Sequence, residues 1–281
     1  MSSYKLEILI SPKPGIQLLP WKELWDYRTL ITLFVRRDFV SSYKQTILGP
    51  LWFIMPPLIQ TFVFTLIFGR VAKIETGNAP QSLFFMSGVI VWNFFASTLM
   101  RSASTFTGNA GLFEKVYFPR LSIAIAAILN NFLSFMIQFI LFVGIYIYYG
   151  ENFRTVNPTL TILLAPLVVI QLSFLALGTG CLITSLTTRY RDFAMMLGFG
   201  LQLWMYASCV VYPLSAVSKE WQWVILLNPV VPVIETFRFA FFGDTAITVI
   251  QILGGWITTI VVLFMGLLAF HSSEKSFVDT V

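Results

Sequence analysis

Residues 35–69 read VRRDFVSSYKQTILGPLWFIMPPLIQTFVFTLIFG, and this stretch decides the fold. The first ten residues mix apolar side chains with the charges of Arg36, Arg37, Asp38 and Lys44, whereas the run that follows Pro50 is almost entirely apolar. The pattern predicts a charged helix along one face of a membrane that leads directly into a membrane-spanning helix. Such an arrangement is typical of a membrane protein that a cytosolic partner drives by pushing on the charged segment.

The composition indicates an all-α integral membrane protein. Of 281 residues, 57% are hydrophobic and 11% charged, against about a quarter charged in soluble domains. We attribute the net charge of +5 to loops on one side of a membrane and expect no nucleic-acid partner. Cys181 and Cys209 both lie in apolar stretches, which favours buried free thiols over a disulfide or a metal site.

Six apolar runs approach the roughly 20 residues that a membrane-spanning helix needs. They lie near residues 50–69, 82–104, 121–149, 159–186, 193–212 and 246–270. With six spans, the N- and C-termini are on the same side. Thirteen of the 18 lysines and arginines fall on that side, so the positive-inside rule predicts that both termini are cytosolic.

Residues 24–44 are predicted to form an amphipathic interfacial helix. Apolar side chains recur there at helical spacing, at Leu24, Tyr27, Ile31, Phe34 and Val35. The basic residues fall on other faces, although Leu33 lies off the apolar face and Asp38 within it. The alternative is a simple membrane-surface anchor.

The segment 213–243 differs from the six runs because Pro229, Pro232, Glu235 and Arg238 interrupt its apolar residues. A proline inside a helix removes a hydrogen bond and costs about 3 kcal/mol or more. We therefore expect two short re-entrant helices at the outer face. Glu235 and Arg238 are three residues apart, so they share a helix face and can form an ion pair.

The motifs of the common enzyme classes are missing from the sequence. It contains no G-x-x-x-x-G-K-[ST] phosphate loop, no H-E-x-x-H metal motif and no G-x-S-x-G nucleophile elbow. Its single histidine, His271, closes the last apolar run, and the spans hold almost no ionisable residues. We expect no catalytic and no metal-binding residues, and interpret the chain as a passive conduit powered from elsewhere.

The connection between the second and third runs, 101–120, is the best candidate for contact with a power source. A short helix there would display an aromatic knob beside charges and could fit a groove on a partner. The residues concerned are Phe113, Glu114, Lys115, Tyr117 and Arg120. The alternative is an ordinary positively charged loop.

Three stretches together resemble a known family. They are RRDFVSSYKQTILGPLWFIMPPLIQTFVFTLIFG (36–69), GNAGLFEKVYFPR (108–120) and LNPVVPVIETFRFAFFG (227–243). From about Leu24 to Phe270 the chain resembles the membrane subunit of bacterial ATP-binding-cassette exporters of type 2. The resemblance is to the branch that exports O-antigen, teichoic acid and other polysaccharides.

The resemblance implies a homodimer in the bacterial inner membrane, with two copies of a separate ATPase subunit that bind ATP and Mg²⁺, so that this chain needs no cofactor of its own. The interfacial helix would cradle the ATPase and residues 112–119 would be the coupling helix that inserts into it. A lipid-linked glycan would pass along the dimer axis. The implied organisation is a cytosolic arm (1–23), an interfacial helix (24–48), a six-helix permease domain (49–271) and a cytosolic tail (272–281).

Aromatic residues make up 16% of the chain, and sugar C–H faces pack well on aromatic rings. We therefore select six candidates for the conduit wall: Trp52, Trp92, Phe95, Trp204, Tyr206 and Tyr212. The alternative is that these rings serve the membrane interface or the lipid-facing surface. Two rival functions remain at this point, a drug or lipid exporter of the same class and a membrane-embedded transferase.

Overall fold

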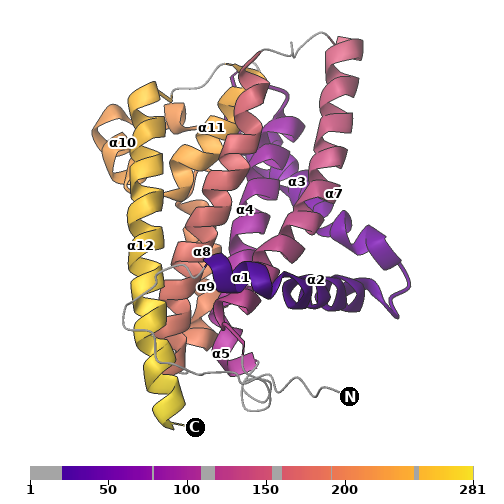
Figure 1. The fold of residues 1–281 in the computed structure, drawn as a ribbon. Coiled ribbons are helices and arrows are strands. Elements are labelled where there is room, and N and C mark those ends of the chain that lie inside the picture. Colours follow the sequence, from indigo (N-terminus) through magenta and orange to yellow (C-terminus); the bar gives the residue numbers. More distant parts are fainter. Residues whose placement is uncertain are drawn as a thin grey trace, which may run out of the picture.

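The computed structural model describes residues 21–77, 79–108, 118–153, 160–190, 192–243 and 247–280. Within these ranges every regular element is a helix, which confirms the all-α prediction for this part of the chain. Long helices run side by side as a bundle, and the short helices α1 (Trp21–Asp26) and α2 (Arg28–Tyr43) lie across it (Figure 1).

Five helical stretches in the described ranges are long and apolar enough to cross a membrane, or six if the bent pair described below counts as one span. The five are Gly49–Val71, Gln81–Ala103, Leu121–Gly150, Thr161–Thr188 and Val249–Ser273. They coincide with the first four predicted runs and with the last one.

The first span consists of three helical pieces. A 3₁₀ turn, η1 (Gly49–Phe53), precedes α3 (Met55–Phe64), and a π-helical segment, η2 (Thr65–Val71), follows it. Prolines lie at the start of η1 and of α3, where the backbone N–H groups have no acceptor within the helix, so a proline costs no hydrogen bond there. Ring stacking of Phe39 on Phe53, with centroids 5.1 Å apart, holds η1 against α2.

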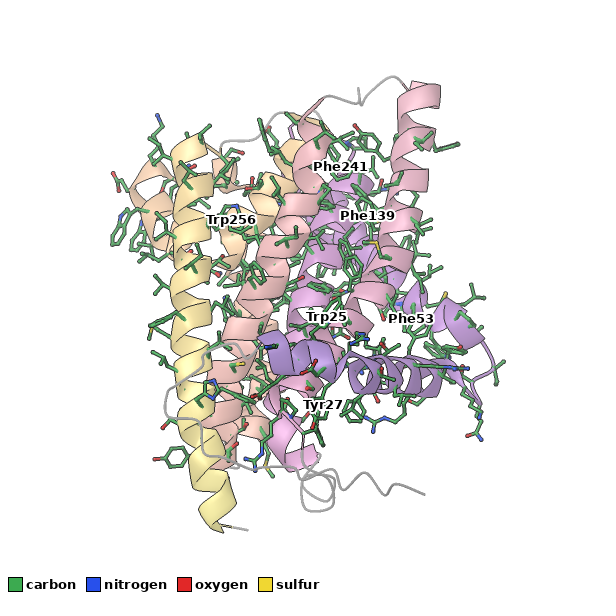
Figure 2. All side chains as sticks on the ribbon, viewed as in Figure 1. Trp25, Tyr27, Phe53, Phe139, Phe241 and Trp256 are labelled. Carbon is green, nitrogen blue, oxygen red and sulfur yellow. The ribbon has the colours of Figure 1, made fainter. Side chains whose placement is uncertain are left out.

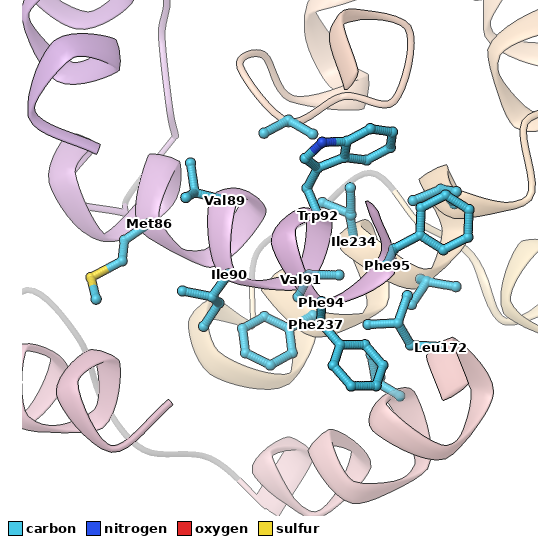
Figure 3. Close-up of a cluster of buried hydrophobic side chains, with 14 of the residues drawn as sticks. Met86, Val89, Ile90, Val91, Trp92, Phe94, Phe95, Leu172, Ile234 and Phe237 are labelled. Carbon is cyan, nitrogen blue, oxygen red and sulfur yellow. The ribbon is translucent and has the colours of Figure 1, made fainter. Parts of the chain in front are cut away.

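Helix α4 (Gln81–Ala103) is the core of the molecule. It is apolar around most of its circumference and buried over most of its length, as expected for a helix that other helices surround. Figure 3 shows Ile90, Trp92, Phe94 and Phe95 radiating from α4 in different directions into this core. The helix packs on α3, on α7 (Leu121–Phe153) and on α8 (Ala165–Arg189).

Helix α8, which follows the 3₁₀ turn η3 (Leu160–Leu164), packs along α12 (Val249–Thr280) on its other side. The two backbones approach closely at Gly178 and Gly266, where a Cβ on either glycine would strike the backbone of the other helix. Small residues at such crossings allow close helix packing in membranes. Helix α12 continues to Thr280, so the region predicted as a tail from 272 is helical over its described length.

The fifth predicted span, 193–212, is shorter than expected. Helix α9 (Asp192–Tyr206) ends six residues early, and residues 207–213 form turns in which Cys209 has a left-handed φ of 56°. Fifteen residues of α-helix extend about 22 Å, less than the ~30 Å hydrocarbon core. Side chains from the following segment bind the backbone carbonyls of this turn.

The proline-containing segment is indeed two short helices. They are α10 (Lys219–Leu226) and α11 (Val230–Phe242), and they meet at a bend of 107°. Helix α11 is almost completely buried, whereas no residue of α10 is. Phe139 of α7 and Phe241 of α11 lie side by side in the bundle, with ring centroids 5.9 Å apart (Figure 2).

The predicted helix at 24–44 is interrupted at Tyr27, which separates α1 from α2. Ile31 and Phe34 are buried against Phe118 and Ala126, while Arg36 and Arg37 are exposed. Leu33 is exposed as well, in keeping with its predicted place off the apolar face.

Candidate functional site

The first group of candidate residues lies where α2 meets the end of α4. The carboxylate of Asp38 accepts a hydrogen bond from Nε of Arg37 at 2.7 Å, and its other oxygen lies 3.9 Å from Nη1 of Arg101 on α4. Arg36 on α2 and Lys44 directly after this helix are both exposed. The acidic residue on the apolar face of α2 is therefore an ionic link to α4.

The coupling segment predicted at 112–119 falls largely outside the described residues. Phe113, Glu114, Lys115 and Tyr117 all belong to the part that is not described. Its two flanks are described. Phe118 is buried, and its ring lies 5.8 Å from that of Phe34 on α2, while Arg120 is partly buried directly before α7. The exit of the coupling segment is thus packed on α2.

The entrance of the coupling segment is tied to α8. The hydroxyl of Thr184 donates to the carbonyl of Ser102 and to that of Gly180 in its own helix, and the hydroxyl of Thr187 donates to the carbonyl of Ala103 at 2.9 Å and to that of Thr184 at 3.1 Å. Each hydroxyl has one hydrogen, which is therefore shared between α4 and α8. The carbonyls of Ser102 and Ala103 belong to the last turn of α4, beyond which the regular hydrogen-bond pattern of the helix ends. The backbone N–H of the cap residue Ser104 also bonds to the carbonyl of Ser102. Ser185 of α8 in turn shares a hydrogen bond with Ser273 of α12. We call this assembly of α2, the end of α4 and α8 the "coupling junction".

The ion pair predicted between Glu235 and Arg238 is confirmed. Nη1 of Arg238 lies 2.9 Å from Oε1 of Glu235, and both side chains are almost inaccessible to solvent. Burial of two charges is costly unless they are paired and hydrogen-bonded. This geometry meets that condition, since Arg238 makes further hydrogen bonds to the backbone.

The six conduit candidates do not form one surface. Trp92 and Phe95 are 4% and 0% exposed, and both pack edge-on against Trp204, with centroids 6.3 and 5.3 Å from it. Trp52 and Tyr206 are 48% and 41% exposed. Tyr212 is partly buried near the end of α9. The first two rings are thus core residues of one subunit, while a conduit role for the exposed ones stays a prediction.

Four residues of these sites were missed in the sequence: Arg101 as the partner of Asp38, Thr184 and Thr187 of α8, and Asn228, whose Oδ1 accepts a hydrogen bond from Nε1 of Trp204. Three of these had a local signal. Asn228 and Pro229 form a dipeptide typical of turns, and 184–188 reads TSLTT, a polar cluster at the end of an apolar run. Arg101 had none, because its partner lies 63 positions earlier in the chain.

Comparison with known proteins identifies the family. Residues 29–242 match the ABC-2 type transporter membrane family. The O-antigen export system permease protein RfbA of Myxococcus xanthus is 26% identical over 263 residues, which cover 92% of this chain and 98% of that protein. RfbA of Klebsiella pneumoniae is 25% identical over 252 residues, with 89% and 94% covered. The polysialic acid transport protein KpsM of Escherichia coli is 25% identical over 248 residues, with 88% and 94% covered. Because the match takes in most of the helical bundle, this chain belongs to the ABC-2 type transporter family of membrane proteins.

Proposed function

We propose that this chain is the membrane subunit of an ATP-driven exporter and that it moves a lipid-linked polysaccharide out of the cytosol through a homodimeric conduit. The observation that carries the proposal is the coupling junction, in a chain whose relatives are named as O-antigen and polysialic acid transport proteins. ATP and Mg²⁺ would bind to a separate ATPase, two copies per dimer.

The coupling junction supports an external drive. Both flanks of segment 109–117 are anchored to other helices, the entrance to α8 through Thr184 and Thr187 and the exit to α2 through Phe118. A partner that displaces this segment would therefore move several helices at once. In this proposal α2 lies along the cytosolic face of the inner membrane, both termini are cytosolic, and α10 and α11 re-enter from the outer face.

The surface of α9 supports a homodimer. Met195, Phe199 and Leu203 are exposed on this helix, and a Cβ added at Gly198 or Gly200 would meet no other atom of the chain. Small residues on an exposed helix allow a second helix to approach closely in the membrane. We assign this face to the second copy, with Trp52 and Tyr206 near the conduit and Phe113, Glu114, Lys115, Tyr117 and Arg120 at the ATPase.

The test is reconstitution of the purified chain with its ATPase in vesicles, followed by measurement of glycolipid export and ATP hydrolysis. Export should require both subunits. Tyr117→Ala or Glu114→Lys should leave membrane insertion intact and reduce the glycan exported per ATP. Transport by the chain alone, or unchanged coupling in both variants, would refute the proposal. Identification of the co-purified lipid separates the rival cargo classes, because small amphiphiles in place of a glycolipid would favour a drug or lipid exporter.

A further inference from the structure

The end of α9 poses a problem of hydrogen bonding. Helix α9 ends at Tyr206, inside an apolar stretch, and only the first two of the seven residues 207–213 still donate backbone hydrogen bonds to α9. Lipid offers no donors, so backbone of this kind survives at membrane depth only where protein groups satisfy it. The carbonyls of Cys209, Val210 and Tyr212 therefore need donors from elsewhere in the chain.

Arg238 of α11 supplies them. Its Nη1 donates to the carbonyls of Cys209 at 2.7 Å and of Tyr212 at 3.4 Å, and its Nη2 donates to the carbonyl of Val210 at 2.8 Å. A guanidinium carries five donors in a fixed plane, which suits three carbonyls in different directions. Glu235 balances the charge from the previous turn of the same helix.

The guanidinium is also fixed from the α4 side. Its carbon lies 3.6 Å from the ring centroid of Phe84, and Nε points to Oγ of Ser87 at 3.5 Å. The lack of a side chain at Gly88 leaves room for the guanidinium of Arg238. A Cβ at position 88 would lie 2.8 Å from both Nη2 of Arg238 and the carbonyl oxygen of Val210. The arginine is thus held between α4, α11 and the turn.

Asn228, at the bend between α10 and α11, satisfies the first part of the turn. Its Nδ2 donates to the carbonyl of Ala207 at 3.1 Å and to Oγ of Ser208 at 2.9 Å. Its Oδ1 accepts from Nε1 of Trp204 at 3.0 Å and from the backbone N–H of Val230 at 3.1 Å. Arg238, in the third turn of α11, and Asn228, just before this helix, therefore bind neighbouring parts of one non-helical segment.

We infer that Arg238, with Glu235 and Asn228, is a positioning clamp that holds residues 207–213 at the outer end of α9 and thereby sets the outer mouth of the conduit. The inference rests on the proposed function for the conduit itself. A purely stabilising ion pair can be replaced by apolar side chains with little loss. A clamp cannot be replaced in this way, because apolar side chains have no donors for the three carbonyls.

The test uses the reconstituted complex of the full chain and its ATPase. In one variant Glu235→Met and Arg238→Met are combined, so that no charge is left unpaired. In a second, Gly88→Ala keeps both charges and displaces the guanidinium. Gly144→Ala on α7 is the matched control, since its Cβ would meet no atom within 4 Å. The two readouts are glycolipid exported per ATP and amide hydrogen exchange of segment 207–213, in which every residue except Pro213 has an amide hydrogen.

In both test variants we expect exchange at 207–213 to rise by at least about tenfold, with little change in α4 and α8, because hydrogen exchange reports local opening. Glycan exported per ATP should fall by a similar factor while ATP hydrolysis continues, and Gly144→Ala should match the wild type in both. Should the double variant fail to fold, Gly88→Ala decides alone. Unchanged exchange would overturn the clamp, and faster exchange with full export would overturn its positioning role. If the wild type itself exports no glycolipid, the proposed function fails, while the exchange measurement still decides whether the clamp exists.

Discussion

The two α8 threonines give the sharpest test of the coupling junction. We predict that replacing Thr184 and Thr187 together by valine lowers the glycan exported per ATP. Valine nearly preserves the shape of threonine but lacks the hydroxyl, so the carbonyls of Ser102 and Ala103 lose their donors from α8. The last turn of α4 would then be free to move without α8.

The size of the effect follows from the two hydrogen bonds. Interhelical hydrogen bonds in membrane proteins contribute on average about 0.6 kcal/mol each, and about 1.7 kcal/mol at most. Losing two should lower the free energy of unfolding by roughly 1.2 kcal/mol, with an upper bound of about 3.4 kcal/mol. If the same 1.2 kcal/mol couples the coupling segment to α8, export per ATP should fall about eightfold at constant ATP hydrolysis.

The assay compares ATP hydrolysis, export and thermal unfolding of the reconstituted complex. Thr188→Val is the matched control, because its hydroxyl donates at 2.7 Å to the carbonyl of Thr184 in its own helix. This control should export as much glycan per ATP as the wild type. The reasoning would be refuted if the double variant lost stability but exported normally, or if the control lost coupling to the same degree.

Three further predictions concern packing, charge and the aromatic rings. Gly266→Ala should lower the free energy of unfolding by about 1–3 kcal/mol, and with it the melting temperature, because the new Cβ would overlap the backbone of Gly178. A melting temperature equal to that of the wild type would contradict the close crossing of α8 and α12. Asp38→Asn should lower the free energy of unfolding by less than about 1 kcal/mol, because the ion pair of Asp38 with Arg101 is partly exposed, but it should reduce the glycan exported per ATP. Export at the wild-type level would show that this ion pair carries no coupling. Trp92→Ala should lower the free energy of unfolding by roughly 3–5 kcal/mol, whereas Trp52→Ala should leave the melting temperature almost unchanged. Equal losses of stability in the two variants would contradict the difference in burial between the two rings.

Local patterns in the sequence were enough for five of the spans and for one pair of charges. Spans follow from run length, and Glu235 and Arg238 meet because three residues separate them on one helix face. The two prolines at 229 and 232 correctly predicted that one span-length segment would be two short helices. Each of these inferences used residues that are neighbours in the chain.

Inferences that needed distant partners failed or were not made. The turn that follows Tyr206 is bound by Arg238, which is 26 to 29 residues beyond the carbonyls that it binds. Trp92 and Trp52 both occur in apolar runs, and no periodicity separates them, because α4 is surrounded by other helices while η1 lies at the edge of the bundle. Composition can say that a ring is in the membrane, but packing decides whether a second helix covers it.

The coupling junction and the outer clamp are connected by a single element. Arg101, at one end of α4, faces Asp38 of α2, while Ser87 and Gly88 of the same helix face the guanidinium of Arg238. Ser87 and Arg101 are fourteen residues apart and so about 21 Å apart along the helix, which is most of the hydrocarbon core, and α4 is enclosed by packed helices along this distance. A helix held in this way shifts or tilts as one body, because a well-packed core does not deform continuously. In the proposed exporter, a displacement of α2 would act on α7, on which most of α2 packs, and on α4 through the pair of Asp38 and Arg101. Helix α4 would carry its share of the movement to residues 207–213, which its Ser87 and Gly88 contact through Arg238.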